Sequence, residues 1–180
     1  MTYTHLLILF FIALISAGIF DIIHQKIPNK LNVAIVLIAL TYHITHSGMS
    51  GVIFSTSGLL IGVACLFIPF ALGGMGAGDV KLMGAVGAVL GPLGVFISFV
   101  YTAMLGGVWA LYLLITKDRK ALGRLVTDLK AVFLTRSIAF MPTPIQRKNA
   151  PRICYGVAIA LGTMLYVSLD FFGGQILTLQ

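Results

Sequence analysis

The chain has 180 residues, of which 59% are hydrophobic and only 9% are charged, and its formal net charge is +7. This composition excludes a soluble domain, which needs a charged and polar surface. It also excludes a transmembrane β-barrel, whose strands alternate apolar and polar residues, because the long segments here are apolar on all sides. The sequence therefore predicts an all-α, polytopic membrane protein.

Six transmembrane helices are expected. The first three cover about residues 4–21, 31–44 and 51–72, and the last covers about 153–172. Between them, residues 82–115 are continuously apolar, and a helix of this length would reach roughly 50 Å, too long for a hydrocarbon core of about 30 Å. Gly-Pro-Leu-Gly at 91–94 is typical of a turn and predicts a short fourth and a longer fifth helix. The N-terminal apolar segment has no preceding Lys or Arg, so we expect a retained helix and not a signal peptide.

The basic residues predict the orientation of these helices. All twelve Lys and Arg fall in the segments 24–30, 73–81 and 117–152, which six crossings place on one side of the membrane. Basic loops stay cytoplasmic, so both termini are expected on the outer side. A five-helix arrangement would put the third segment outside, against this rule. The charge is thus explained by topology, with the lipid bilayer as partner, and no feature indicates nucleic acid.

The third basic segment contains a further predicted helix. In residues 119–134 apolar side chains recur at helical spacing, with the basic ones away from them. This pattern is typical of an amphipathic helix at the cytoplasmic interface, between the fifth and sixth crossings. A helix packed against the other crossings is the alternative. We expect a single domain over residues 1–180 and no internal repeat.

Two aspartates, Asp21 and Asp79, lie at the cytoplasmic ends of predicted membrane helices. A charged residue at this depth needs a reason. Asp21 could pair with Lys26 at the interface, and Asp79 could be a helix N-cap. Four glycines in residues 73–78 precede Asp79, and a helix cap does not need them. Glycine is useful where the backbone adopts unusual angles or approaches a ligand closely.

Paired carboxyl groups suit peptide hydrolysis without a metal or another cofactor. Two neighbouring carboxyls share one proton, since both cannot easily ionise. One can then act as base toward water while the other acts as acid toward the carbonyl or the leaving amine. The pair Asp21 and Asp79 is therefore the predicted catalytic pair.

Three motifs carry a resemblance to a known family. They are Asp21 with the following Lys26-Ile27-Pro28-Asn29, the segment Gly76-Ala77-Gly78-Asp79-Val80-Lys81-Leu82, and Tyr155-Gly156-Val157-Ala158-Ile159-Ala160. With them the sequence resembles the type IV prepilin peptidases, the GxGD class of membrane aspartic peptidases, from the first predicted crossing to the last. The resemblance implies that Asp21 and Asp79 are catalytic and that Gly76 and Gly78 are the glycines of the GxGD motif. It implies a supporting electrostatic role for Lys81, for which a snorkelling lysine is the alternative.

The resemblance also implies a substrate. Family members cleave pilin-like precursors after a glycine at the cytoplasmic face, removing a basic leader that precedes an apolar helix. Long members also carry a zinc-binding region with paired CxxC motifs and methylate the new N-terminus. This chain has two cysteines, Cys65 and Cys154, and no CxxC. It resembles the short peptidases of tight-adherence (Flp) pilus systems in the bacterial inner membrane, without methyltransferase activity, metal or cofactor.

Two alternatives remain open in the sequence. A small cation- or proton-coupled transporter, or a pilus-assembly subunit, could use the same aspartates, with the glycine run as a broken helix. His43 and His46 have a spacing that a metal could use, but two ligands make a poor site. We expect them in a polar loop on the outer face. The oligomeric state is left open.

Overall fold

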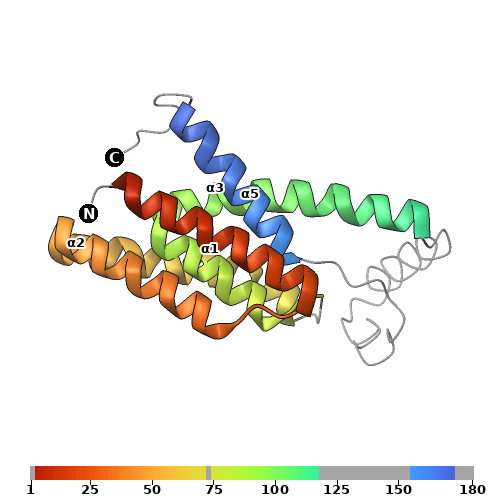
Figure 1. Cartoon of the computed structure of the whole chain (residues 1–180), viewed down its shortest axis with the longest axis horizontal. Coiled ribbons are helices and arrows are strands. Elements are labelled where there is room, and N and C mark those ends of the chain that lie inside the picture. The colour runs from red at the N-terminus through yellow and green to blue at the C-terminus, as the bar shows by residue number, and fades with distance from the viewer. Residues whose placement is uncertain (1–2, 72–73, 118–154, 173–180) are drawn as a thin grey trace, which may run out of the picture. The chain divides into compact units, whose positions relative to one another are not determined.

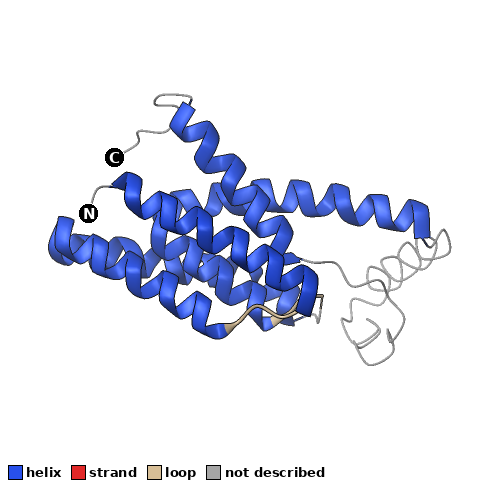
Figure 2. Ribbon diagram, in the orientation of Figure 1, coloured by secondary structure: helices blue, strands red, loops and turns tan. Residues whose placement is uncertain are grey.

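The computed structural model describes residues 3–71, 74–117 and 155–172 of the chain. Within these ranges every regular element is an α-helix, as Figure 2 shows. The helices are α1 (Tyr3–His24), α2 (Asn29–Ala71), α3 (Ala77–Lys117) and α5 (Tyr155–Phe172), labelled in Figure 1. The predicted all-α class is confirmed for these residues, whereas the predicted helix at 119–134 lies outside them.

The chain divides into two compact units, Met1–Leu105 with Cys154–Gln180, and Gly106–Ile153. The first unit contains α1, α2, most of α3, and α5. In the described part of the second unit, the rings of Trp109 and Tyr112 lie 6.1 Å apart. The single domain over residues 1–180 stays a prediction, because most of the second unit lies outside the described residues.

The described helices have the surface of a membrane protein. Three of them are long and apolar enough to cross a bilayer: α1, α2 and the part of α3 that ends at Tyr112. On α1 the side chains of Ile8, Ile12 and Ile15 are each more than half exposed. Such a continuous apolar surface is unfavourable in water and favourable against lipid. The predicted membrane class is confirmed.

Glycines divide α2 and α3 into two halves each. Gly48 has φ 58° and ψ −131°, and Gly91 has φ 74° and ψ −175°. Positive φ is disfavoured for residues with a Cβ, so both turns depend on glycine. A side chain on Gly91 would also overlap the ring of Phe54. The break expected between the second crossing (31–44) and the third (51–72) and the break predicted at 91–94 are confirmed, while the count of six crossings stays a prediction.

The chain reverses its direction at Gly48. A Cβ on Gly51 would overlap the backbone carbonyl of His43. Residues eight apart in a continuous helix are separated by about 12 Å along the axis. The two halves of α2 therefore lie against each other as a helical hairpin.

Small residues hold the second half of α2 against the first half of α3. A side chain on Gly58 would overlap the backbone of Gly87, and one on Gly62 would overlap the backbone of Met83. The numbering rises along one helix as it falls along the other, so the two are antiparallel. Close backbone approach through small residues is a packing mode of membrane helices, which gain little from apolar burial among themselves.

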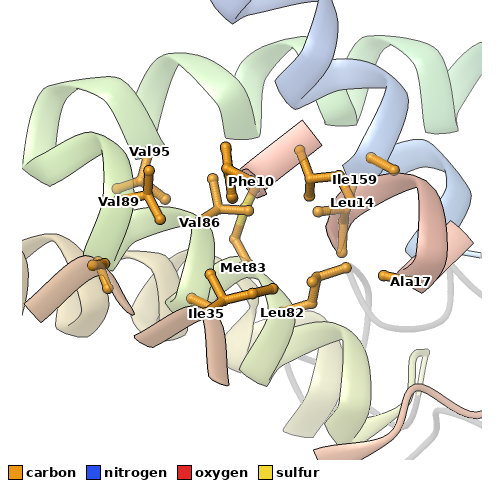
Figure 3. Close-up of a cluster of buried hydrophobic side chains, with 14 of the residues drawn as sticks. Phe10, Leu14, Ala17, Ile35, Leu82, Met83, Val86, Val89, Val95 and Ile159 are labelled. Atoms are coloured by element: carbon orange, nitrogen blue, oxygen red, sulfur yellow. The ribbon is translucent and has the colours of Figure 1, made fainter. Parts of the chain in front are cut away.

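The buried core is made by residues of α1, α2, α3 and α5. On α1 the buried residues Leu6, Phe10, Leu14 and Ala17 recur every three or four positions and so share one face. Figure 3 shows the cluster that they join, which includes Ile35, Leu82, Met83, Val86, Val89 and Ile159. The same face of α1 continues to Asp21, so the helix that builds the core also positions this aspartate.

Two side chains from α2 bond to carbonyl groups next to the turn at Gly91. Pro92 has no N–H, so the carbonyl of Ala88 lacks its helical donor. The hydroxyl of Ser55 donates to this carbonyl at 2.8 Å. The Nε2 of His43 donates to the carbonyl of Val89 at 3.2 Å. The two hydrogen bonds stabilise the irregular backbone at which the first half of α3 ends.

The expectation for His43 is therefore wrong. Its side chain is buried inside the bundle, and the ring lies 5.1 Å from that of Phe54. His46 is exposed, as expected. The sequence signal failed because a histidine next to a polar segment is equally compatible with a surface position and with a buried donor.

Replacing Ser55 by alanine should lower the thermal stability of the protein. The change leaves the Ala88 carbonyl buried without a donor, which costs about 1–3 kcal/mol, or several degrees in Tm for a chain of this size. The measurement is a thermal unfolding curve of the purified protein in detergent. Ser57→Ala is the matched control, because this partly exposed serine donates to the carbonyl of Phe54 within its own helix. Equal Tm values for the two variants would contradict the structural role of Ser55.

Candidate active site

Asp21 lies near the end of α1, on the face that packs against α5, and its side chain is buried. Its Oδ2 accepts a hydrogen bond of 2.9 Å from the N–H of Gly156, the second residue of α5. The first N–H groups of a helix have no partner within it, and they favour an anionic group. The start of α5 therefore holds the Asp21 carboxyl in place.

Glycine is required at position 156 by this close contact. A Cβ there would lie 2.9 Å from Oδ2 of Asp21 and 3.0 Å from its Cγ. Either the Asp21 side chain or the backbone of α5 would have to move. One turn away the same helices are less crowded, since a Cβ on Gly18 would lie 3.8 Å from that of Ala160. In the sequence, Tyr155-Gly156 stands out only through the family resemblance, which assigns it no role. In the structure, its role is the contact of Gly156 with Asp21.

Asp79 lies in the first turn of α3, and its side chain is also buried. Its Oδ2 accepts the N–H of Gly76 at 3.1 Å, and its own N–H donates to the carbonyl of Gly76 at 3.2 Å. Asp79 is therefore the third helical residue, reaching back to the residue before the helix, as the acidic partner of a capping box does. The alternative that Asp79 is itself the N-cap is wrong.

Gly76 and Gly78, just before Asp79, do not have positive φ. Within the described residues, positive φ occurs among glycines at Gly48 and Gly91, not at Gly76 or Gly78. The remaining effect of glycine is the space that a side chain would otherwise take. A Cβ on Gly76 would lie 3.4 Å from Oδ2 of Asp79, and one on Gly78 would lie 3.4 Å from Cβ of Ile27. The absence of side chains leaves one side of the Asp79 carboxyl open to another molecule.

The start of α2 holds the turn that carries Asp79. The Nδ2 of Asn32 donates to the carbonyl of Gly78 at 3.3 Å. The Nζ of Lys81 donates to Oδ1 of Asn29 at 3.1 Å. Lys81 is exposed, and its partner Asn29 is neutral. Its contact in the structure therefore joins α3 to the start of α2 and does not stabilise a carboxylate.

The two aspartates come together from separate helices. The Asp79 carboxyl lies near enough to that of Asp21 and to the hydroxyl of Tyr155 for electrostatic interaction with each of them. The ends of three elements, α1, α3 and α5, thus meet at one place. Among the described residues there is no group of three or more His, Cys, Asp or Glu that could hold a metal ion.

This arrangement can be compared with known proteins. The model of the type IV leader peptidase family matches residues 8–111, a range that contains Asp21, Asn29 and the turn from Gly76 to Asp79. It ends before α5, so Gly156 lies outside it. No curated protein and no solved structure matches the chain. The matched range covers more than half of the sequence, and the chain belongs to the type IV leader peptidase family.

Proposed function

We propose that this protein is an aspartic endopeptidase of the GxGD class that removes the basic leader from type IV pilin-like precursors of the tight-adherence (Flp) kind. Asp21 and Asp79 would be its catalytic pair. The observation that carries the proposal is that two buried carboxyls from different helices lie near enough for their charges to interact, and that each is bonded to a backbone N–H. A buried carboxyl at membrane depth is costly and marks a functional site.

The geometry supports a hydrolysis in which the two carboxyls share one proton. One carboxylate takes a proton from a water molecule, whose oxygen attacks the carbonyl carbon of the scissile peptide bond. The protonated carboxyl gives its proton to the carbonyl oxygen. When the tetrahedral intermediate breaks its C–N bond, the amine leaves with a proton from the pair. The pair titrates as a unit, so neither aspartate is assigned as the base.

Backbone donors give this pair its preorganisation. The N–H of Gly156 holds one oxygen of Asp21, and the N–H of Gly76 holds one oxygen of Asp79. These bonds select one rotamer for each side chain and leave further lone pairs for water and substrate. Groups held in place before the reaction need no reorganisation during it.

The site is proposed to lie at the cytoplasmic face of the bacterial inner membrane, with six crossings and both termini outside. Asp21 is near the end of α1, and Asp79 and Gly156 are near the starts of α3 and α5. Lys26 and Lys30, next to the start of α2, mark this side as basic. A leader could reach the pair there while the apolar helix of the precursor stays in lipid. The absence of CxxC motifs supports a peptidase without methyltransferase activity.

Replacing either aspartate by asparagine should abolish cleavage. The substitution Asp21→Asn or Asp79→Asn keeps the size of the side chain, but an amide cannot carry the shared proton, and we expect cleavage to fall at least about 100-fold. The measurement is the size shift of a co-expressed pilin-like precursor on a gel. Asp170→Asn is the matched control, because this aspartate is exposed at the other end of α5.

The outcomes of this experiment separate the competing functions. Cleavage that survives Asp21→Asn or Asp79→Asn would rule out the carboxyl pair as the catalyst. If the wild-type protein cleaves no co-encoded pilin-like protein, a transporter or assembly subunit becomes the better explanation of the same residues.

Gly76→Ala should lower kcat while the protein stays folded. The added methyl group meets Oδ2 of Asp79 at an ordinary contact distance, so the turn can form. The methyl group would, however, occupy the open side of the carboxyl, and displacement of water or substrate there can slow the reaction about 10- to 100-fold. Kinetics of precursor cleavage by the purified variant test this. Gly107→Ala is the control, since a Cβ at Gly107 has no neighbour within 4 Å. Unchanged kcat in Gly76→Ala would contradict the role given to the open side.

Gly156→Ala should reduce both stability and cleavage. The methyl group would meet the Asp21 carboxyl closer than real Cβ contacts allow, so either the hydrogen bond or the packing of α1 on α5 must give way. Overpacking of this kind costs about 1–3 kcal/mol, which a thermal unfolding curve detects. Gly18→Ala, between the same two helices but with room for a methyl group, should behave as the wild type. A Gly156→Ala protein with normal Tm and normal cleavage would show that α5 does not hold Asp21.

A further inference from the structure

A residue outside the proposed catalytic pair is bonded to the backbone of the catalytic turn. Asn32 lies in the first turn of α2 and is only 4% exposed. Its Nδ2 donates to the carbonyl of Gly78 at 3.3 Å. That carbonyl belongs to the peptide group that joins Gly78 to Asp79, so the bond restrains the backbone from which the Asp79 side chain projects.

The same amide has an unused acceptor. A carbonyl can only accept, so the nitrogen of the Asn32 amide must face Gly78, and the orientation of the amide is determined. Its Oδ1 is then buried without a hydrogen-bond partner. Because both atoms are on one amide carbon, Oδ1 lies beside the Gly78–Asp79 peptide group. A buried acceptor without a donor is unfavourable for stability, and a leucine of similar size would avoid this cost.

The surroundings favour a peptide as the missing donor. Gly76 and Gly78 have no side chains, so the backbone of the turn is accessible to a chain lying against it. An extended peptide carries an N–H at every residue except proline, and each N–H that leaves water needs an acceptor. The Oδ1 of Asn32 is such an acceptor, beside the peptide group that joins Gly78 to Asp79.

We propose that Asn32 is a positioning residue for hydrolysis at this site, and that its Oδ1 accepts a main-chain N–H of the bound leader peptide. Nδ2 keeps the Gly78–Asp79 peptide group in place, and Oδ1 aligns the substrate with the turn. The proposal rests on the proposed peptidase function and deepens it. It explains why an amide occupies a buried position where an aliphatic side chain would be more stable.

Asn32→Leu removes both bonds without leaving a polar group behind. We expect kcat for precursor cleavage to fall about 10-fold or more through misplacement of Asp79, and KM to rise about 2- to 10-fold through the lost substrate bond. The Tm of the variant should equal or exceed that of the wild type, because the unpaired acceptor is gone. If Asn32 had only a structural role, its replacement would lower Tm and the amount of folded protein together with activity.

Asn32→Asp separates the two bonds. It keeps an acceptor oxygen but replaces the N–H donor by a second oxygen, so kcat should fall while KM stays within about 2-fold of the wild type. The kinetics are measured at 0.5 M salt, where the Debye length is roughly 4 Å, to limit attraction between the new charge and a basic leader. Thr163→Val is the matched control, because it removes another fully buried and unpaired polar atom, on α5.

The results distinguish this inference from the proposed function. If the wild type and Thr163→Val cleave the precursor and Asn32→Leu loses activity with an unchanged Tm, the inference is supported. Wild-type kcat/KM in Asn32→Leu would overturn it and leave the peptidase function intact. A fall in activity that only follows the loss of folded protein would also overturn it. An inactive wild type would overturn the proposed function and this inference with it.

Discussion

A carboxyl group that is buried at membrane depth needs a hydrogen-bond donor, and the described structure is arranged around this requirement at two places. In both, the donor is a backbone N–H at the start of a helix: Gly156 for Asp21 and Gly76 for Asp79. Such groups have no partner inside their own helix, so they bind an acid without adding a positive charge. A lysine or arginine donor would have fixed each carboxyl as an anion, whereas neutral donors allow the pair to keep one proton.

The rest of the fold brings these helix starts together. The core residues of α1 place Asp21 on the face that α5 covers, while the glycine contacts between α2 and α3 hold the helix whose first turn contains Asp79. The first turn of α2 adds a second level of support, because Asn29 and Asn32 bond to residues on either side of Asp79. The proposed catalytic residues come from distant parts of the sequence, and each depends on a contact made by a different helix.

Much of this could be predicted from the sequence. Membrane helices are visible as long apolar segments, and Asp21 and Asp79 stand out because charges are rare in them. Gly48 and Gly91 could be located because polar residues or a proline accompany them. Contacts between helices were not accessible in the same way. Nothing local distinguishes the N–H of Gly156 or the amide of Asn32 from the many others in the chain, and both acquire their role from a neighbour more than forty residues away.

The errors have physical causes as well. Glycine before Asp79 was compatible with unusual backbone angles or with close approach of a ligand, and Gly76 and Gly78 do not have positive φ. His43 was expected, together with His46, in a polar loop on the outer face. It is buried because a carbonyl on another helix needs a donor. In both cases the residue type was compatible with two environments, and only tertiary contacts decide between them.

The turn at Gly91 has a consequence for the surrounding lipid. The first half of α3 ends there, and from residue 77 to residue 90 it is only about 20 Å long, against a hydrocarbon core of about 30 Å. A helix this short either thins the bilayer or turns within it, and the mismatch has an energetic cost in both cases. Irregular backbone at such depth is tolerated only where protein surrounds it. The hydrogen bonds from Ser55 and His43 meet this condition, since they replace the water that an ordinary loop would use. The short first half of α3 can therefore end inside the hydrocarbon core, and the bilayer around the protein need not become thinner to match its length.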